Sequence, residues 1–326
     1  MTEPVTVPAG GVKVEVASSP DGRRRVSVCA GTACVFAGSL KIKDEFEAQI
    51  AAAGLQDDVE VSIIGCHGLC SQGPLAVVSG GDTYYPRLKL KDVKTVVEEH
   101  LAGGQIVEKL LYKDPATGEP VACAHDIPFY KAQRRIALRD VGVINPESTD
   151  EYLARGGYEA ARKALTTMKP EEIIEEVLAS GLRGRGGAGF PTGMKWKFAS
   201  ASPGDVKYII CNGDEGDPGA FMDASIMDGD PHAVLEGMLI GSYAIGAHEG
   251  YIYVRAEYPL AVKRLRMAIA AAEERGLLGD DALGSGWDFH LKIKEGAGAF
   301  VCGEETALIA SIEGKRGMPR TRPPFP

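Results

Sequence analysis

The sequence GLRGRGGAGFPTGMK, residues 181–195, has six glycines within the thirteen positions from Gly181 to Gly193. Such a segment loses much chain entropy on folding and buries little, so we interpret it as a loop that brings backbone N–H groups close to a ligand. Cationic side chains lie inside the loop and directly after it, at Arg183, Arg185 and Lys195. We therefore expect an anionic ligand.

Residues 184–189 also satisfy the G-x-G-x-x-G pattern of dinucleotide-binding folds. That pattern requires a strand in front of the loop, whereas residues 169–180 have the pattern of a helix that starts at Pro170 and ends at Gly181. The ordinary dinucleotide-binding context therefore fails. Without a ligand, the segment would be a glycine-rich crossover between two packed elements.

Two acidic loops follow predicted strands in the same half of the chain. They read CNGDEGDPG at residues 211–219 and EGAGAFVCGEE at residues 295–305. Open α/β sheets bind ligands at the carboxyl ends of their strands, and amide and carboxylate groups suit ring N–H groups and ribose hydroxyls. Taken singly, each loop is equally compatible with a solvated turn, and Glu304 and Glu305 with helix capping. Together with the glycine loop, they predict a binding site.

Four cysteines form two pairs, each directly after a predicted strand: Cys29-x4-Cys34 and Cys66-x3-Cys70. Four thiolates are the ligand set of a [2Fe–2S] cluster or of a tetrahedral zinc ion. Structural zinc usually takes tighter C-x2-C spacings, so the pattern favours the cluster, with zinc and coincidence as alternatives. We place His67 outside the ligand set, either beside the ligands or facing solvent.

The hydrophobic pattern predicts two α/β domains. In the first, we expect strands at 23–29, 59–65, 75–78 and 83–85 and helices at 34–53 and 90–101, which makes a small domain with a mixed sheet. In the second, we expect helices at 131–140, 152–167, 169–180, 233–245, 259–275 and 303–313 and strands at 206–211, 250–254 and 291–295. The predicted organisation is a flexible N-terminus at 1–21, a small domain at 22–103, a linker at 104–128 with a short strand at 105–111, and a larger domain at 129–326.

Composition limits the partners. The formal net charge of −9 and the pI near 5.3 argue against nucleic acid or an anionic membrane surface. We expect the short basic runs at 23–25 and 134–135 to lie on solvated surfaces. The sequence shows no signal peptide and no apolar stretch long enough to span a bilayer, which predicts a cytoplasmic protein. Because that compartment is reducing, clustered cysteines favour metal or redox chemistry over disulfides.

The cysteine pairs on their β-α-β-β-α frame resemble the thioredoxin-like ferredoxin domain that accompanies the flavin subunits of complex I, over about residues 22–103. This resemblance implies that a [2Fe–2S] cluster is bound by Cys29, Cys34, Cys66 and Cys70. The motif RGRGGAGFPTGMKW at 183–196, with the two acidic loops, resembles the NADH-binding flavoprotein of complex I and the β-subunits of multimeric hydrogenases and NAD-dependent formate dehydrogenases. A ferredoxin domain on the same chain is similar to the hydrogenase or formate dehydrogenase type.

The second resemblance implies an FMN site and a nicotinamide site. FMN would be held by Gly184, Arg185, Gly186, Gly187, Lys195, Asn212, Asp214, Glu215, Gly303 and Glu304. NAD, with NADP left open, would lie near Phe190, Lys195, Phe198, Asp217 and Glu305. Asp217 stands where the family commonly has Glu, and Phe300 where it commonly has Tyr. The shorter acid weakens the preference for NAD over NADP.

The family continues beyond this sequence with a helical domain whose four cysteines bind a [4Fe–4S] cluster. Here Cys123, Cys211 and Cys302 are too scattered to replace them, so we expect either a fragment or a different electron path.

The predicted function is that of a diaphorase module. NAD(P)H gives a hydride to FMN, and single electrons pass to iron–sulfur centres, in either direction and without a side chain as general acid or base. The expected partners are other iron–sulfur subunits of a hydrogenase or formate dehydrogenase, or of a ferredoxin-linked assembly. The alternatives are an electron-relay or assembly protein with a [2Fe–2S] cluster but no working flavin, and a zinc-bound scaffold.

Overall fold

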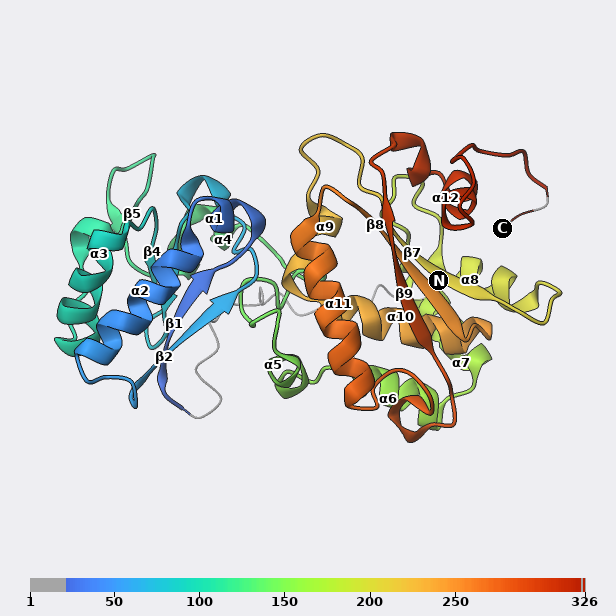
Figure 1. The fold of residues 1–326 in the computed structure, drawn as a ribbon, viewed down its shortest axis with the longest axis horizontal. Helices are drawn as coiled ribbons and strands as arrows, with labels where there is room; N and C mark the ends of the chain where they lie inside the picture. The colour runs from blue at the N-terminus through green and yellow to red at the C-terminus, as the bar shows by residue number, and fades with distance from the viewer. Residues whose placement is uncertain (1–21, 324, 326) are drawn as a thin grey trace. The chain divides into compact units, whose positions relative to one another are not determined.

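The computed structural model describes residues 22–323 and 325, and it divides the chain into two compact units, residues 1–146 and 147–326 (Figure 1). The segment 1–21, predicted to be flexible, lies outside the described residues. The α/β fold class predicted for both halves is confirmed. The predicted domain boundaries remain predictions.

The first unit has a four-stranded mixed sheet in the order β2-β1-β3-β4. Its strands are β1 (Arg24–Cys29), β2 (Val59–Ile64), β3 (Ala76–Val78) and β4 (Thr83–Tyr85). β1 runs parallel to β2 and antiparallel to β3, so the predicted mixed sheet is confirmed. Its first helices are α1 (Thr32–Phe36), α2 (Ser39–Ala52) and α3 (Leu90–Thr95), and α3 continues in π-helical turns at Val96–Ala102.

The single helix predicted at 34–53 is two helices. Gly38 lies between α1 and α2 with a left-handed φ of 92°, a conformation that glycine adopts without strain. The strand predicted at 105–111 is wrong, because this segment holds a 3₁₀ turn at Glu108–Leu110. The chain then forms a hairpin of β5 (Tyr112–Lys113) and β6 (Pro120–Val121), a 3₁₀ turn at Ala124–Asp126 and α4 (Pro128–Lys131). Val107, Leu111, Tyr112, Ala124 and Ile127 are buried in the cores of the first unit.

The helix predicted at 131–140 is also wrong, because α4 ends at Lys131. Arg135 instead turns inward, and its guanidinium donates hydrogen bonds to the carbonyl oxygens of His67 (2.9 Å) and Val141 (3.1 Å). Arg25 is likewise fully buried and donates to the Ser62 hydroxyl at 2.6 Å. For these two arginines the predicted solvated surface is wrong, because both guanidinium groups are buried and donate hydrogen bonds to oxygen acceptors inside the protein.

The second unit has a parallel sheet of β7 (Tyr208–Gly213), β8 (Glu249–Arg255) and β9 (His290–Gly296), in that order. The helices α10 (Pro231–Ile245) and α11 (Pro259–Glu274) contact this sheet. The other helices are α5 (Thr149–Ala154), α6 (Glu159–Thr167), α7 (Pro170–Ser180), α8 (Thr192–Ala201), α9 (Met222–Gly229) and α12 (Glu305–Ile312), with 3₁₀ turns at Ala282–Gly284 and Phe300–Gly303. Since all three strands are parallel, their carboxyl ends meet at one edge, and the loops after β7 and β9 leave from it.

The predicted helix at 152–167 breaks at Gly157, where a Cβ would lie 2.1 Å from the Tyr152 ring. The buried carboxylate of Glu236 accepts hydrogen bonds from the Tyr152 hydroxyl (2.5 Å) and from the backbone N–H groups of Tyr158 (2.9 Å) and Ala161 (3.1 Å). It thereby caps α6 from a distant part of the sequence. A local pattern could not show this acceptor.

Candidate cofactor sites

The structure brings the two cysteine loops to one edge of the first sheet. β1 and β2 are parallel and in register, with Cys29 opposite Ile64, so both loops leave the sheet on the same side. The Sγ atoms of Cys66 and Cys70 lie 3.5 Å apart, and the Cys29 thiol hydrogen-bonds with those of Cys34 and Cys66. The four predicted ligands therefore form one cluster of thiols.

The cysteines contact one another pairwise. Among the described residues, no three His, Cys, Asp or Glu side chains are arranged so that they could hold a single metal ion. Hydrogen bonds from Cys29 and then from Cys70 lower the pKa of Cys66 to about 3, and the Cys29 hydrogen bond lowers the pKa of Cys34. The same hydrogen bonds raise the pKa values of Cys29 and Cys70, so the four thiols share their protons. Once deprotonated, four cysteine sulfurs are the donor set of an iron–sulfur cluster.

Two glycines allow the cysteine loops to approach so closely. A Cβ on Gly31 would lie 2.7 Å from the Cβ of Cys66, and a Cβ on Gly73 would lie 2.6 Å from the Sγ of Cys34. Both distances are far shorter than ordinary carbon and sulfur contacts. Only glycine therefore fits beside the thiols at these two positions.

His67 lies inside the second cysteine loop but is fully buried, so the solvent-facing interpretation is wrong. Its Nδ1 lies 2.5 Å from the Tyr130 hydroxyl. Burial, followed by the Arg135 charge, lowers its pKa to about 3, so the ring is neutral. His67 and Arg135 together fix the loop that carries Cys66 and Cys70.

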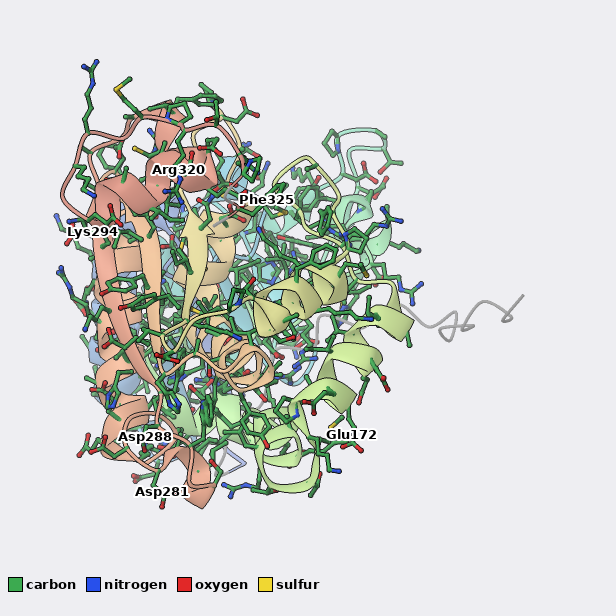
Figure 2. The ribbon with its side chains drawn as sticks, turned by 90° about the vertical axis from the view of Figure 1, so that its right-hand side faces the viewer. Glu172, Asp281, Asp288, Lys294, Arg320 and Phe325 are labelled. Carbon is green, nitrogen blue, oxygen red and sulfur yellow. The ribbon has the colours of Figure 1, made fainter. Side chains whose placement is uncertain are left out.

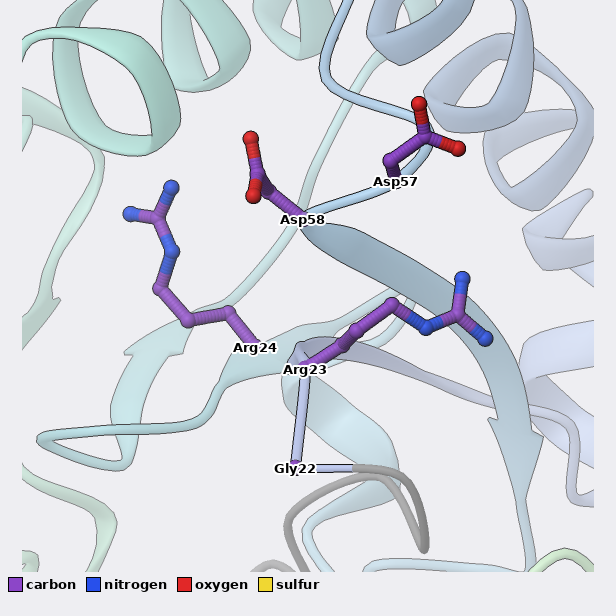
Figure 3. A pocket seen from close by; sticks show the side chains of 5 residues that line it. All are labelled: Gly22, Arg23, Arg24, Asp57 and Asp58. Atoms are coloured by element: carbon purple, nitrogen blue, oxygen red, sulfur yellow. The ribbon is translucent and has the colours of Figure 1, made fainter.

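A separate groove lies at the opposite end of β1 and β2, away from the cysteines. Gly22, Arg23, Arg24, Asp57 and Asp58 line it (Figure 3). Its two cations and two carboxylates balance one another.

In the second unit, the glycine loop joins α7 to α8, so a helix does precede it, as predicted. Its base is closed by hydrogen bonds from Gly184 N to Phe190 O and from Thr192 N to Leu182 O, both 2.9 Å. A Cβ on Gly186 or Gly187 would meet no atom within 4 Å. The tip of the loop is therefore open to a ligand.

The arginines of the loop contact its backbone. Arg183 donates to the Gly189 carbonyl at 3.0 Å, and Arg185 donates to the Arg183 carbonyl at 2.6 Å. Gly187 and Gly189 have left-handed φ values of 103° and 61°. Their conformations, together with these side-chain contacts, fix the shape of the loop.

The second acidic loop reaches the helix that follows the glycine loop. Lys195 on α8 places its Nζ 3.2 Å from a carboxylate oxygen of Glu305, the first residue of α12. Glu304 caps α12 by accepting from the backbone N–H groups of Thr306 (2.9 Å) and Ala307 (3.0 Å). The Thr306 hydroxyl donates to the same carboxylate and is the largest cause of the lowered pKa of Glu304. The predicted capping role of Glu304 is therefore present in the structure.

The first acidic loop contacts the second acidic loop just before α12. The Asn212 amide donates to the Gly303 carbonyl at 2.9 Å, and its oxygen accepts from Asp214 N at 3.1 Å. Asp214 is only 8% exposed, and neither of its carboxylate oxygens has a hydrogen-bond partner among the described residues. Burial raises the pKa of Asp214. A buried carboxylate without a donor is costly, which indicates that a ligand supplies the donor.

Glu215 behaves differently from its neighbour. Its carboxylate accepts from the backbone N–H groups of Met222 (2.7 Å), Asp223 (3.1 Å) and Ala224 (3.1 Å), at the start of α9. No sequence pattern indicated α9, because a side chain seven residues before Met222, and not a residue at the helix start, holds its first turn. The carboxylate of Glu215 is thus engaged within the protein.

Three phenylalanines on or next to these segments are exposed: Phe190 in the glycine loop, Phe198 on α8 and Phe300 in the second acidic loop. The exposed fractions are 48% for Phe190, 56% for Phe198 and 74% for Phe300. A Cβ on Gly216 would lie 2.7 Å from the Phe300 ring, so this ring rests on the first acidic loop. Asp217 is exposed on the same loop. Flat exposed rings are suited to stacking on a planar cofactor.

Sequence reasoning missed Arg322. Its guanidinium lies 2.6 Å from a Glu304 oxygen and 2.5 Å from a Glu305 oxygen. The segment after α12 returns to this helix, where Arg320 N donates to the Thr306 hydroxyl at 2.9 Å (Arg320 is labelled in Figure 2). The sequence around Arg322 contains no pattern that indicates its ion pairs with Glu304 and Glu305.

Comparison with known families finds a match in each half of the chain. Residues 177–326 match the Nuo51 FMN-binding domain, and residues 15–101 match the thioredoxin-like [2Fe–2S] ferredoxin. The chain joins a [2Fe–2S] ferredoxin domain to a Nuo51 FMN-binding domain. No described helix is long and apolar enough to cross a membrane.

Curated relatives share much of this sequence. The chain is 61% identical over 196 residues to the NADP-reducing hydrogenase protein HndC of Solidesulfovibrio fructosivorans, which covers 60% of this chain and 40% of that protein. It is 59% identical over 179 residues to an NADH-quinone oxidoreductase component of Aquifex aeolicus, covering 55% of this chain and 42% of that protein. The matches therefore span less than half of these relatives.

A solved structure extends the likeness over both domains. The NAD⁺-reducing [NiFe]-hydrogenase in its H₂-reduced state has a chain that is 30% identical, with a TM-score of 0.50. The match covers 93% of this chain and 48% of that one. The likeness to this hydrogenase chain therefore extends over most of both units of the present chain.

Proposed function

We propose that this chain is the diaphorase module of a multisubunit hydrogenase or formate dehydrogenase. It would exchange a hydride between NAD(P)(H) and FMN and exchange single electrons with iron–sulfur centres. The observation that carries the proposal is the convergence of three segments far apart in sequence. Lys195 contacts Glu305 at 3.2 Å, Asn212 contacts the Gly303 carbonyl at 2.9 Å, and Asp214 lies buried beside them without a donor.

We expect different side chains at this site to bind different parts of the ligands. Lys195 supplies positive charge for a phosphate, and the open tip of the glycine loop supplies backbone N–H groups. Asp214 can accept a hydrogen bond from a ring N–H or a hydroxyl. Phe190 and Phe198 provide stacking faces. When bound, FMN supplies the conversion between two-electron and one-electron transfer.

The proposed FMN ligands are Gly184, Arg185, Gly186, Gly187, Lys195, Asn212, Asp214, Glu215, Gly303 and Glu304. The proposed nicotinamide neighbours are Phe190, Lys195, Phe198, Asp217 and Glu305. The exposed carboxylate of Asp217 would repel a 2′-phosphate, which supports NAD, whereas the relative HndC is named for NADP. We propose that the site takes NAD(H) or NADP(H). We also propose that the protein is cytoplasmic, as predicted from the sequence.

The test uses the full chain, reconstituted anaerobically with iron and sulfide and then with or without FMN. We expect NADH or NADPH to reduce an artificial acceptor only when FMN is present. A chain with its [2Fe–2S] cluster and added FMN that reduces no acceptor would instead support the relay function.

A pair of variants localises the activity. Gly186→Glu places a carboxylate at the open loop tip, where no described atom within 4 Å of the new Cβ would clash with it. We expect this variant to lose FMN-dependent activity through repulsion of the phosphate. Ala201→Glu adds the same side chain at the exposed end of α8 and serves as the matched control. Equal activity in both variants would show that the glycine loop does not bind FMN.

A further inference from the structure

A shallow groove borders the first cysteine loop of the ferredoxin domain. It has a volume of about 580 Å³ and is lined by residues of α1, α2, the segment 73–74 and the segment 87–90. Phe36 on α1 is 96% exposed, and Leu90 at the start of α3 is 48% exposed. An almost fully exposed aromatic side chain beside a groove is a feature of protein-binding surfaces.

The groove lies next to the thiols. Gly73 lines it, and a Cβ on this glycine would lie 2.6 Å from the Sγ of Cys34. The segment with Arg87 is held against residues 72–74, directly after the second cysteine loop. Arg87 N donates to Gln72 O at 2.8 Å, and Leu88 N donates to Pro74 O at 2.9 Å. A protein seated in this groove would therefore be separated from a cluster ligand by a single glycine.

The charge of the groove is one-sided. Its lining residues include the cations Lys41, Arg87 and Lys89 and no carboxylate. All three cations are exposed, and none forms an ion pair among the residues that the structure describes. The whole chain carries a formal charge of −9, so this basic face is opposite in sign to the net charge. Such a patch selects a partner with a negative docking face.

We infer that this groove is the docking site of an acidic one-electron carrier protein that exchanges electrons with the [2Fe–2S] cluster. Cys29, Cys34, Cys66 and Cys70 would hold the cluster, which would supply one-electron transfer: in the outward direction one electron would leave the reduced chain and enter the oxidised carrier, with no proton or group transferred. Phe36 and Leu90 would form the apolar centre of the interface, and the three cations would form its rim. This inference rests on the [2Fe–2S] cluster and is independent of the proposed flavin activity.

The test reduces the reconstituted full chain with dithionite, so that neither FMN nor NADH is needed, and removes the excess by anaerobic gel filtration, so that dithionite cannot reduce the acceptors directly. An acidic plant-type [2Fe–2S] ferredoxin and the basic protein cytochrome c then serve as electron acceptors at low salt. The double variant Lys41→Glu/Lys89→Glu should slow electron transfer to the ferredoxin by about tenfold or more, since electrostatic steering changes association rates by 10 to 10³. It should accelerate transfer to cytochrome c.

Binding gives a second readout that does not depend on electron transfer. Isothermal titration should show weaker ferredoxin binding to the double variant and to Phe36→Ser, and the charge effect should fade as salt is added. The control is Lys113→Glu/Lys131→Glu, which reverses two exposed cations of the same unit outside the groove. The EPR spectrum of the cluster should stay unchanged in all variants.

Two results would overturn the inference. The first is a double variant that binds and reduces the acidic ferredoxin as fast as the wild type or the control pair. The second is an equal loss of rate with both acceptors, because a docking charge must act in opposite directions on acidic and basic partners.

Discussion

Replacing Gly31 with alanine should disrupt the cysteine site while leaving the rest of the fold in place. The new Cβ would lie 2.7 Å from the Cβ and 2.9 Å from the Cα of Cys66. The Cys66 backbone cannot yield freely, because Arg135 holds the neighbouring His67 carbonyl at 2.9 Å. The φ of Gly31 is −71°, so alanine meets crowding and no backbone strain.

The expected cost follows from that crowding. Overpacking of a close-packed site costs about 1–3 kcal/mol, and alanine is a poorer N-cap residue than glycine at the start of α1. A total of about 2 kcal/mol corresponds to roughly a 30-fold increase in local opening. Hydrogen exchange followed by mass spectrometry should therefore show about 30-fold faster exchange in peptides that cover β1 and β2.

The matched control is Gly81→Ala in the β3–β4 turn. There the nearest atom to the new Cβ is the Thr83 hydroxyl at 3.7 Å, an ordinary contact. We expect this control to keep wild-type exchange and a full content of iron and sulfide, whereas Gly31→Ala should lose cluster. Equal exchange rates and equal iron content in the two variants would show that the cysteine site tolerates a side chain at Gly31.

Three further predictions concern the second unit. Lys195→Met should weaken FMN binding about tenfold or more, since hydrogen bonds to charged groups contribute about 1.5–3 kcal/mol. The control Lys197→Met, on the same helix, should leave FMN binding unchanged. Equal dissociation constants for the two variants in a fluorescence titration would contradict this prediction. Asp214→Asn removes a buried carboxylate that lacks a donor, so it should stabilise the FMN-free chain by about 1 kcal/mol, measured as a higher urea midpoint. The same variant should weaken FMN binding. The control Asp205→Asn, at an exposed position, should change neither the urea midpoint nor FMN binding. Burial lowers the pKa of His232 to about 4, so the unfolded state binds more protons below pH 6.5 and stability should fall by about 3 kcal/mol between pH 6.5 and 4. Both tryptophans lie in the second unit, so tryptophan fluorescence in urea reports its unfolding, and a His232→Gln variant with an equally steep pH dependence would count against this assignment.

The sequence predicted best where the signal is local. The alternation around β1 and β2, followed by paired cysteines, indicated both the strands and the thiol cluster, because parallel strands deliver their loops to one edge. The helix in front of the glycine loop was also predicted, from Pro170 at its start and Gly181 at its end.

Local patterns failed where a side chain outside an element completes it. The first turn of α9 is held by Glu215, which lies seven to nine residues before its donors, and the start of α6 is held by Glu236, whose backbone donors lie 75 and 78 residues away. α8 was missed because its apolar residues do not gather on one face. The contacts of Arg322 with Glu304 and Glu305 likewise arise only when the chain folds back over α12.

The most direct test of the shared FMN and nicotinamide site is an anaerobic titration of the full chain with FMN, followed by NADH and, separately, NADPH. We expect saturable binding of one FMN per chain and bleaching of the bound flavin by at least one of the two nucleotides. FMN that remains free at saturating protein, or bound flavin that neither nucleotide bleaches, would contradict this expectation.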